Sequence, residues 1–145
     1  MSLANNQTFA LWQSFRQRQK EIKNPAGTDL HSIQVYPADF NPRSFTPHTV
    51  FEKWAAIEVL SLDDIPEGLA HFELHGGLYA VFLHRGTPQQ FSATWQYIFF
   101  EWLPQSGYKL DHRPHFEVLG SKYKNNDATS EEEVWIPVRE KTETV

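Results

Sequence analysis

The 145-residue sequence contains no cysteine, and this absence excludes several kinds of site. Disulfides, thiolate nucleophiles and cysteine-ligated zinc all require that side chain. The count leaves the redox compartment undetermined.

Long apolar runs are missing as well. No stretch approaches the roughly 18 residues needed to span a bilayer, and the first nine residues, MSLANNQTF, lack the charged and apolar regions of a signal peptide. We therefore expect a cytoplasmic protein without a membrane segment.

Positive charge is too scarce for a nucleic-acid surface. Lys and Arg together number 13 against 18 Asp and Glu, so the formal net charge is −5. Proteins that bind DNA through its phosphates carry a broad basic surface. Direct DNA binding is not expected.

Aromatic residues are abundant by contrast, at 14% of the chain with five Trp. Trp and Tyr fill hydrophobic cores, but they also line ligand sites because each combines a large apolar ring with a polar group. At this length one hydrophobic core is sufficient, so a single domain is expected.

The hydrophobic periodicity predicts two helices and a set of short strands. Residues 7–23 fit an amphipathic helix, and Thr87-Pro88-Gln89-Gln90 fits the capping box that begins a second one, ended by Pro104 and Gly107. Strands are expected at residues 30–36, 51–60, 71–74, 78–84, 115–120 and 133–139.

This order predicts an α+β fold made of two βαββ units, the first of which lacks its first strand. Short connections between neighbouring strands favour a mostly antiparallel sheet with both helices on one face. A ligand cleft is expected on the other face.

Each predicted strand divides into two alternating sets of side chains, because successive residues point to opposite faces. One set is aliphatic and is expected beneath the helices. The other is too polar for a dry core and too aromatic for an ordinary solvated face, and it contains Tyr36, Trp54, Glu58, His115, Glu117 and Trp135. Such a set suits an organic cation, which aromatic faces and a carboxylate both attract. A solvated sheet face is the alternative.

Three stretches carry a resemblance to a known family. They are residues 77–86 (GLYAVFLHRG), residues 102–108 (WLPQSGY), and residues 113–119 (RPHFEVL) followed by 133–138 (EVWIPV). They resemble the GyrI-like small-molecule (effector) binding domains, which are related to the effector domains of AraC- and MerR-type regulators.

The resemblance implies a duplicated βαββ domain with a ligand cleft between its halves, here residues 7–62 and 70–139, with a tail at 140–145. It also implies that Glu117 is the pocket carboxylate and that Trp102 belongs to the pocket. No cofactor is implied.

Three functions remain open at this point. The first is binding of a cationic or amphipathic organic ligand, with Glu117 as the counter-charge. The second is a hydrolase of strained electrophilic toxins in which Glu117 is catalytic. The third is a gyrase-directed inhibitor or interaction protein. A homodimer that completes the sheet is a further possibility.

Two other groups of residues suggest simpler roles. Histidine pairs such as His71 and His75 lie beside predicted turns and match no zinc-binding motif, so no metal site is expected. The run Glu131-Glu132-Glu133 fits a solvated turn that leads into the last strand.

Overall fold

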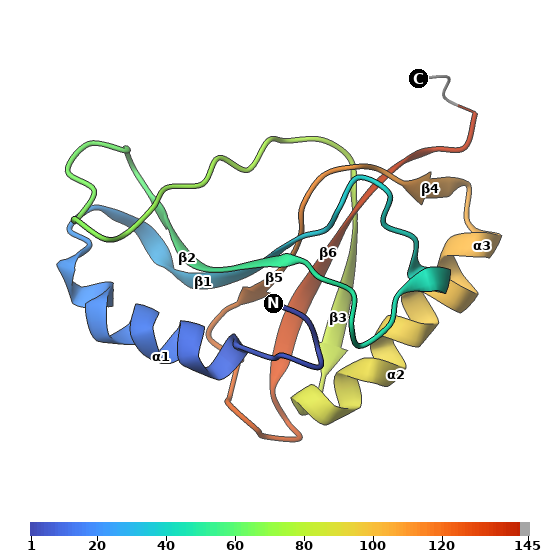
Figure 1. The fold of residues 1–145 in the computed structure, drawn as a ribbon, viewed down its shortest axis with the longest axis horizontal. Helices are drawn as coiled ribbons and strands as arrows, with labels where there is room; N and C mark the ends of the chain where they lie inside the picture. Colours follow the sequence, from blue (N-terminus) through green and yellow to red (C-terminus); the bar gives the residue numbers. More distant parts are fainter. Residues whose placement is uncertain (143–145) are drawn as a thin grey trace.

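The computed structural model describes residues 1–142, and its elements follow the predicted order closely (Figure 1). The helical elements are α1 (Thr8–Arg18), the 3₁₀ turns Gln19–Glu21, Pro42–Ser44 and Pro88–Gln90, α2 (Phe91–Gln96), a π-helical turn (Tyr97–Trp102) and α3 (Leu103–Gln105). The strands are β1 (Pro25–Val35), β2 (Glu52–Val59), β3 (Tyr79–Arg85), β4 (Tyr108–Leu110), β5 (His115–Leu119) and β6 (Glu131–Glu140).

The strands form one open six-stranded sheet with the order β2-β1-β5-β6-β3, and β4 pairs with the end of β6. All five strand pairings are antiparallel. The two helical regions lie on one face, while the connection from β2 to β3 passes over the other (Figure 1). The predicted α+β class is therefore confirmed.

The main core lies between the second helical region and β6. Ile98 and Phe99 pack against Val134, Ile136 and Val138, all nearly inaccessible to solvent. Burying such aliphatic side chains contributes roughly 1.5–3 kcal/mol each. This layer fixes the helix over one side of the sheet.

The start of this helical region is confirmed in detail. Thr87 Oγ1 accepts a hydrogen bond from the Gln90 backbone at 3.3 Å, and the Gln90 side chain accepts one from the Thr87 backbone at 2.8 Å. These reciprocal bonds satisfy backbone donors that a helix start otherwise leaves unpaired.

Two details of the strand prediction were wrong. Residues 71–74 form no strand; instead Phe72 packs edge-on against Trp54, with ring centroids 5.0 Å apart. Strand β4 was not expected, because three residues carry too little alternation to be recognised. It forms because the end of β6, Val138–Glu140, offers a partner to Tyr108–Leu110.

No strand precedes α1 within residues 1–142, so β2 has a free edge. The N-terminal segment instead bonds to the chain before β2, through Met1 N to Phe51 O (2.9 Å) and Ala4 N to Pro47 O (2.7 Å). Of the predicted tail, residue 140 ends β6 and residues 143–145 lie outside the described part. No helix among the described residues is long and apolar enough to cross a membrane.

Candidate functional site

The strand register determines which predicted site residues share a face. Glu117 lies opposite Val134 on one side and Ser32 on the other. Directly paired residues point the same way, so Glu117 lies on the face that holds the Val134 core and the helices. The cleft was expected on the opposite face, and for Glu117 that expectation was wrong.

The same register places Trp135, Trp54 and Glu58 on the face away from the helices. Trp135 lies opposite Phe116, Phe116 opposite Ile33, and Ile33 opposite Trp54. Glu58 follows Trp54 by four residues on the same strand and is exposed. The strand-face comparison had placed these three residues in one set with Glu117. The register shows that they lie on the opposite face from it.

The physical reason lies in the two central strands. The helices lie toward the two ends of the sheet, so the middle of the helix face need not be aliphatic (Figure 1). There β1 and β5 present Ser32, Gln34, His115 and Glu117, and turn Ile33 and Phe116 to the other face. Assigning the aliphatic set of every strand to the helices failed for these two strands.

Glu117 is partly buried and has one direct hydrogen-bond donor. Gln34 Nε2 donates to its Oε1 at 3.2 Å. Burial raises the pKa of Glu117, while the charge of Lys53 and the bond from Gln34 oppose that shift. Among the described residues no basic nitrogen comes within 4 Å of this carboxylate.

A second carboxylate lies near the first, and the sequence interpretation missed it. The run Glu131-Glu132-Glu133 is the start of β6 rather than a solvated turn. Glu133 is exposed, whereas Glu132 shares the face of Val134 and is partly buried. Burial and the charge of Glu117 raise the pKa of Glu132 to about 7.

Tyr36 and His115 are the predicted site residues that do lie near Glu117. His115 precedes Glu117 by two residues on the same face, and the charge of Glu117 helps burial to raise the pKa of Tyr36. The Tyr36 and His115 rings meet edge to face at 4.8 Å. Burial lowers the pKa of His115 to about 3, so this imidazole is neutral at physiological pH.

An aromatic cluster extends from this pair to the second helical region. Tyr36 stacks on Phe40 at 4.1 Å, and Phe45 lies 6.1 Å from Tyr36 and 5.5 Å from Trp95. Trp95 in turn packs on Phe99 of the core, with ring centroids 4.7 Å apart. Trp95 therefore belongs both to the core and to the aromatic surroundings of Tyr36.

A cavity of about 200 Å³ lies beside this cluster. Tyr36, Phe40 and His115 line it together with Asp111 and Arg113. Glu117 is not among its lining residues. The cavity brings two of the predicted site residues to one accessible space.

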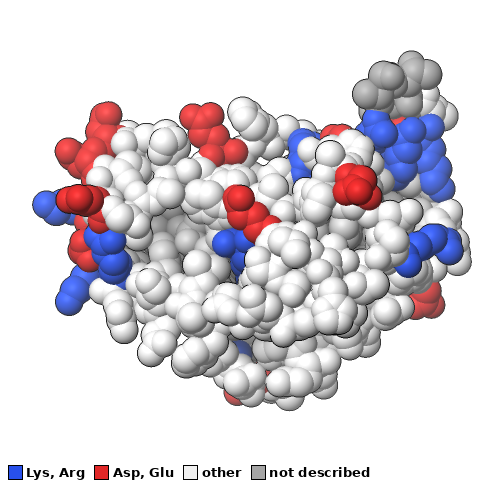
Figure 2. All heavy atoms as spheres, viewed as in Figure 1, with Lys and Arg blue, Asp and Glu red and all other residues white. Residues whose placement is uncertain are grey.

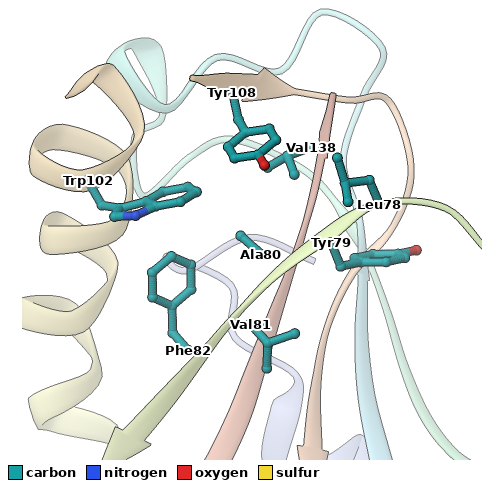
Figure 3. Close-up of a pocket in the computed structure, with 8 residues that line it drawn as sticks. All are labelled: Leu78, Tyr79, Ala80, Val81, Phe82, Trp102, Tyr108 and Val138. Carbon is teal, nitrogen blue, oxygen red and sulfur yellow. The ribbon is translucent and has the colours of Figure 1, made fainter. Parts of the chain in front are cut away.

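Trp102 lies in a different place, at the β3 edge of the sheet (Figure 3). Its ring packs edge-on against Phe82 at 5.0 Å and lies parallel to Tyr108 at 6.3 Å. A second cavity, of about 230 Å³, opens among these rings and is lined without any charged side chain. Trp102 thus lines a pocket, but Glu117 does not line it.

The opposite face carries its own aromatic group. Trp135 stacks on Phe116 with centroids 5.2 Å apart and meets Tyr79 at 5.7 Å. The guanidinium carbon of Arg113 lies 4.5 Å from the centre of the Tyr79 ring. This arrangement already supplies a cation to these rings from within the protein.

Charge is distributed unevenly over the surface. Figure 2 shows charged side chains gathered toward two ends of the viewed face, with a broad, sparsely charged region between them. Acidic and basic groups lie side by side at the left end, and a small basic group lies at the upper right. On that face the described residues form no continuous basic surface of the kind that DNA phosphates require.

Comparisons with known proteins agree with this fold. The family model of the GyrI-like small molecule binding domain matches residues 2–139. The transcriptional regulator BrlR of Pseudomonas aeruginosa is 29% identical over 129 residues, which cover 88% of this chain and 45% of the regulator. A DNA gyrase inhibitor of Edwardsiella piscicida is 33% identical over 105 residues, covering 68% of this chain and 65% of the inhibitor. The chain thus spans less than two thirds of the length of either relative.

Proposed function

The chain belongs to the GyrI-like small-molecule-binding family, and we propose that it binds a small organic cation beside Glu117. One observation carries this proposal. Glu117 is a partly buried carboxylate that lacks a salt-bridge partner among the described residues and lies near an aromatic cluster. A carboxylate removed from water is costly unless it is paired.

An aromatic cation would supply the missing partner. Its charge would pair with Glu117, and the rings of Tyr36, Phe40 and Phe45 would favour it both by apolar contact and by their negative faces. Neutral His115 adds no opposing charge. The ligand class is therefore a flat or bulky apolar molecule that carries one positive charge.

Fluorescence titration with tetraphenylphosphonium, a permanent cation, tests the proposal. We expect saturable quenching by this probe and none by the neutral analogue triphenylmethane at equal concentration. Glu117→Gln should weaken binding by about 10- to 100-fold, the usual cost of losing one charge-assisted contact.

The matched control is Glu58→Gln, since Glu58 is an exposed carboxylate on the other face. It should leave the affinity unchanged. Equal affinities for wild type and Glu117→Gln would contradict the proposal.

A hydrolase is the second candidate, and the pair of carboxyl groups favours it. A general acid or base is most effective when its pKa lies near the working pH, and that of Glu132 is about 7. Incubation with a cyclopropane-containing electrophile, followed by mass spectrometry, should then show addition of one water. That addition should be lost in Glu117→Gln.

Action on gyrase is the third candidate, because one relative bears the name of a DNA gyrase inhibitor. Exposed apolar side chains along strand β3, at Val81 and Leu83, offer a surface for a protein partner. A supercoiling assay with purified gyrase tests this directly. Unchanged supercoiling at a tenfold molar excess of the chain would contradict it.

A homodimer is compatible both with binding of a small cation and with action on gyrase. Strand β2 has a free edge within the described residues, and a second copy could pair with it. Sedimentation equilibrium of wild type and of a Glu58→Pro variant tests whether such a dimer forms through β2. The variant should be monomeric if β2 forms the interface.

A further inference from the structure

Glu132 and Glu117 form a close pair on the helix face of the sheet. Glu117 is in register with Val134, and Glu132 lies two residues before Val134 on β6, on the same face. Such diagonal neighbours have α-carbons about 7–8 Å apart, a distance that two glutamate side chains readily shorten. The two carboxyl groups therefore interact directly by charge.

Lys53 is the cation that faces both members of the pair. Lys53 is on β2, opposite Gln34 of β1, and is partly buried. Its charge lowers the pKa of both Glu117 and Glu132, opposing the effect of burial. Two carboxylates beside one ammonium leave a net charge of −1 when both are ionised.

Among the described residues, the other titratable groups around Glu132 form no salt bridge with it. His84 lies opposite Glu132 on β3, but its Nδ1 is 2.7 Å from Thr94 Oγ1 and its Nε2 is 3.2 Å from the Thr87 carbonyl oxygen. The carbonyl can only accept, so Nε2 donates to it, and Nδ1 shares a hydrogen bond with the threonine hydroxyl. Both nitrogens of His84 are thus already engaged by α2 and its cap.

From the remaining elements, the groups facing this region are two tyrosines and two exposed cations. Burial and, after it, the charge of Glu132 raise the pKa of Tyr123, on the connection after β5, whereas the charge of Arg16 of α1 lowers it. Lys122 pairs at 3.7 Å with Glu131 rather than with Glu132. Tyr36, directly after β1, is held neutral by burial and by Glu117.

We propose that Glu117 and Glu132 act as a coupled pair that exchanges one proton for the positive charge of the ligand. This inference rests on the cation-binding function proposed above. In the free protein the pair keeps one proton, because two partly buried carboxylates beside a single lysine repel each other. When a cation binds, both carboxyl groups ionise and the proton passes to solvent.

The structure supports this exchange in its energetics as well as its geometry. Burial and the charge of Glu117 raise the pKa of Glu132 to about 7, which places the exchange at neutral pH. Ligand affinity should then rise with pH. For one proton linked with a pKa of about 7, the affinity should be about tenfold higher at pH 8 than at pH 6.

Calorimetric titration with tetraphenylphosphonium measures the proton directly, since this probe has no proton of its own to lose. At pH 7, in buffers of different ionisation enthalpy, wild type should release about half a proton per bound probe. Glu132→Gln should release none, and its affinity should be nearly the same at pH 6 and pH 8. Glu133→Gln, at the exposed neighbour on the other face, should behave as wild type.

The outcomes separate this inference from the function on which it rests. If wild type fails to bind the probe at any pH, the cation-binding function is contradicted and the exchange with it. If wild type binds without releasing a proton, or Glu132→Gln still releases one, only the exchange is contradicted.

A measurement without ligand provides a second test of the coupling between Glu117 and Glu132. In carbon-13 spectra of the glutamate carboxyl groups, Glu132 should titrate near pH 7, and its midpoint should fall in Glu117→Gln. A midpoint near the ordinary 4.5, unchanged by that substitution, would overturn the coupling.

Discussion

Glu117 and Trp135 lie on neighbouring strands of the sheet but point to opposite faces. Glu117 is in register with Val134, the residue before Trp135, and side chains alternate along a strand. A small ligand that contacts the Glu117 carboxylate therefore cannot contact the Trp135 ring. The aromatic surroundings of the carboxylate come instead from Tyr36, its neighbours in the loop after β1, and Trp95.

This face assignment makes a direct prediction for tryptophan fluorescence. With tetraphenylphosphonium as the ligand, Trp95→Phe should lose much of the quenching, because Trp95 belongs to the cluster near Glu117. Trp135→Phe should keep it, since Trp135 packs on Phe116 across the sheet. Quenching that is lost in Trp135→Phe and kept in Trp95→Phe would instead place the ligand on the face away from the helices.

Replacing Glu132 should stabilise the protein at alkaline pH. A carboxyl group whose pKa rises from 4.5 unfolded to about 7 folded favours the folded state while protonated, and this advantage is lost as the pH rises through that window. As the pH rises from 4 to 8, the free energy of unfolding of Glu132→Gln should therefore increase by about 1–3 kcal/mol relative to that of wild type. Urea unfolding at both pH values measures the change.

The exposed neighbour provides the comparison. Glu133→Gln should differ from wild type by less than about 0.5 kcal/mol at either pH, as expected at a surface position. A gain of equal size in both variants would mean that net charge, rather than the buried pair, governs the effect.

His115 should make the protein sensitive to acid. Its folded pKa is lowered to about 3 from 6.5, so the unfolded chain binds a proton that the folded protein excludes, and stability falls as pH drops below about 6.5. His115→Phe removes this term. As the pH falls from 7 to 4, the free energy of unfolding of the variant should increase by about 2–3 kcal/mol relative to that of wild type.

Thermal or urea unfolding of both proteins across this range tests the prediction. Parallel stability curves for wild type and His115→Phe would show that His115 binds a proton equally well in the folded and unfolded states, and would contradict the lowered pKa.

The layer between the second helical region and β6 should dominate stability. Ile98 is 1% exposed and packs on the aliphatic side chains of β6. Ile98→Ala should cost about 2–5 kcal/mol, as for other buried aliphatic side chains truncated in a core. Leu60→Ala, at a residue 76% exposed, should change the free energy of unfolding by less than about 0.5 kcal/mol. Similar losses for both would contradict this assignment of the core.

Local signals in the sequence predicted most of the fold. The capping box at Thr87 and the period of the apolar residues after it identified the second helical region. Alternation identified β1, β2, β5 and β6, because the side chains that alternate along a strand lie within a few residues of one another. Strand β4 could not be predicted in this way, since its only support is a distant partner, the end of β6.

The composition of the site was less predictable for the same reason. The motif around Glu117 pointed to that residue, but its neighbours depend on the register between β5, β1 and β6. A one-residue change of register reverses the face of every side chain. Glu132 was overlooked because three consecutive glutamates resemble a solvated turn, and only the register with β5 shows that the middle one turns inward.

The location of the bound ligand is the most direct test of a cation site beside Glu117. Two-dimensional amide NMR spectra of the isotope-labelled chain, recorded during titration with tetraphenylphosphonium, would map it. We expect the largest shifts at Gln34, Tyr36, Lys53, Glu117 and Glu132, which share the helix face. Shifts concentrated at Trp54, Tyr79 and Trp135 on the other face, or around Trp102 at the β3 edge, would contradict the account.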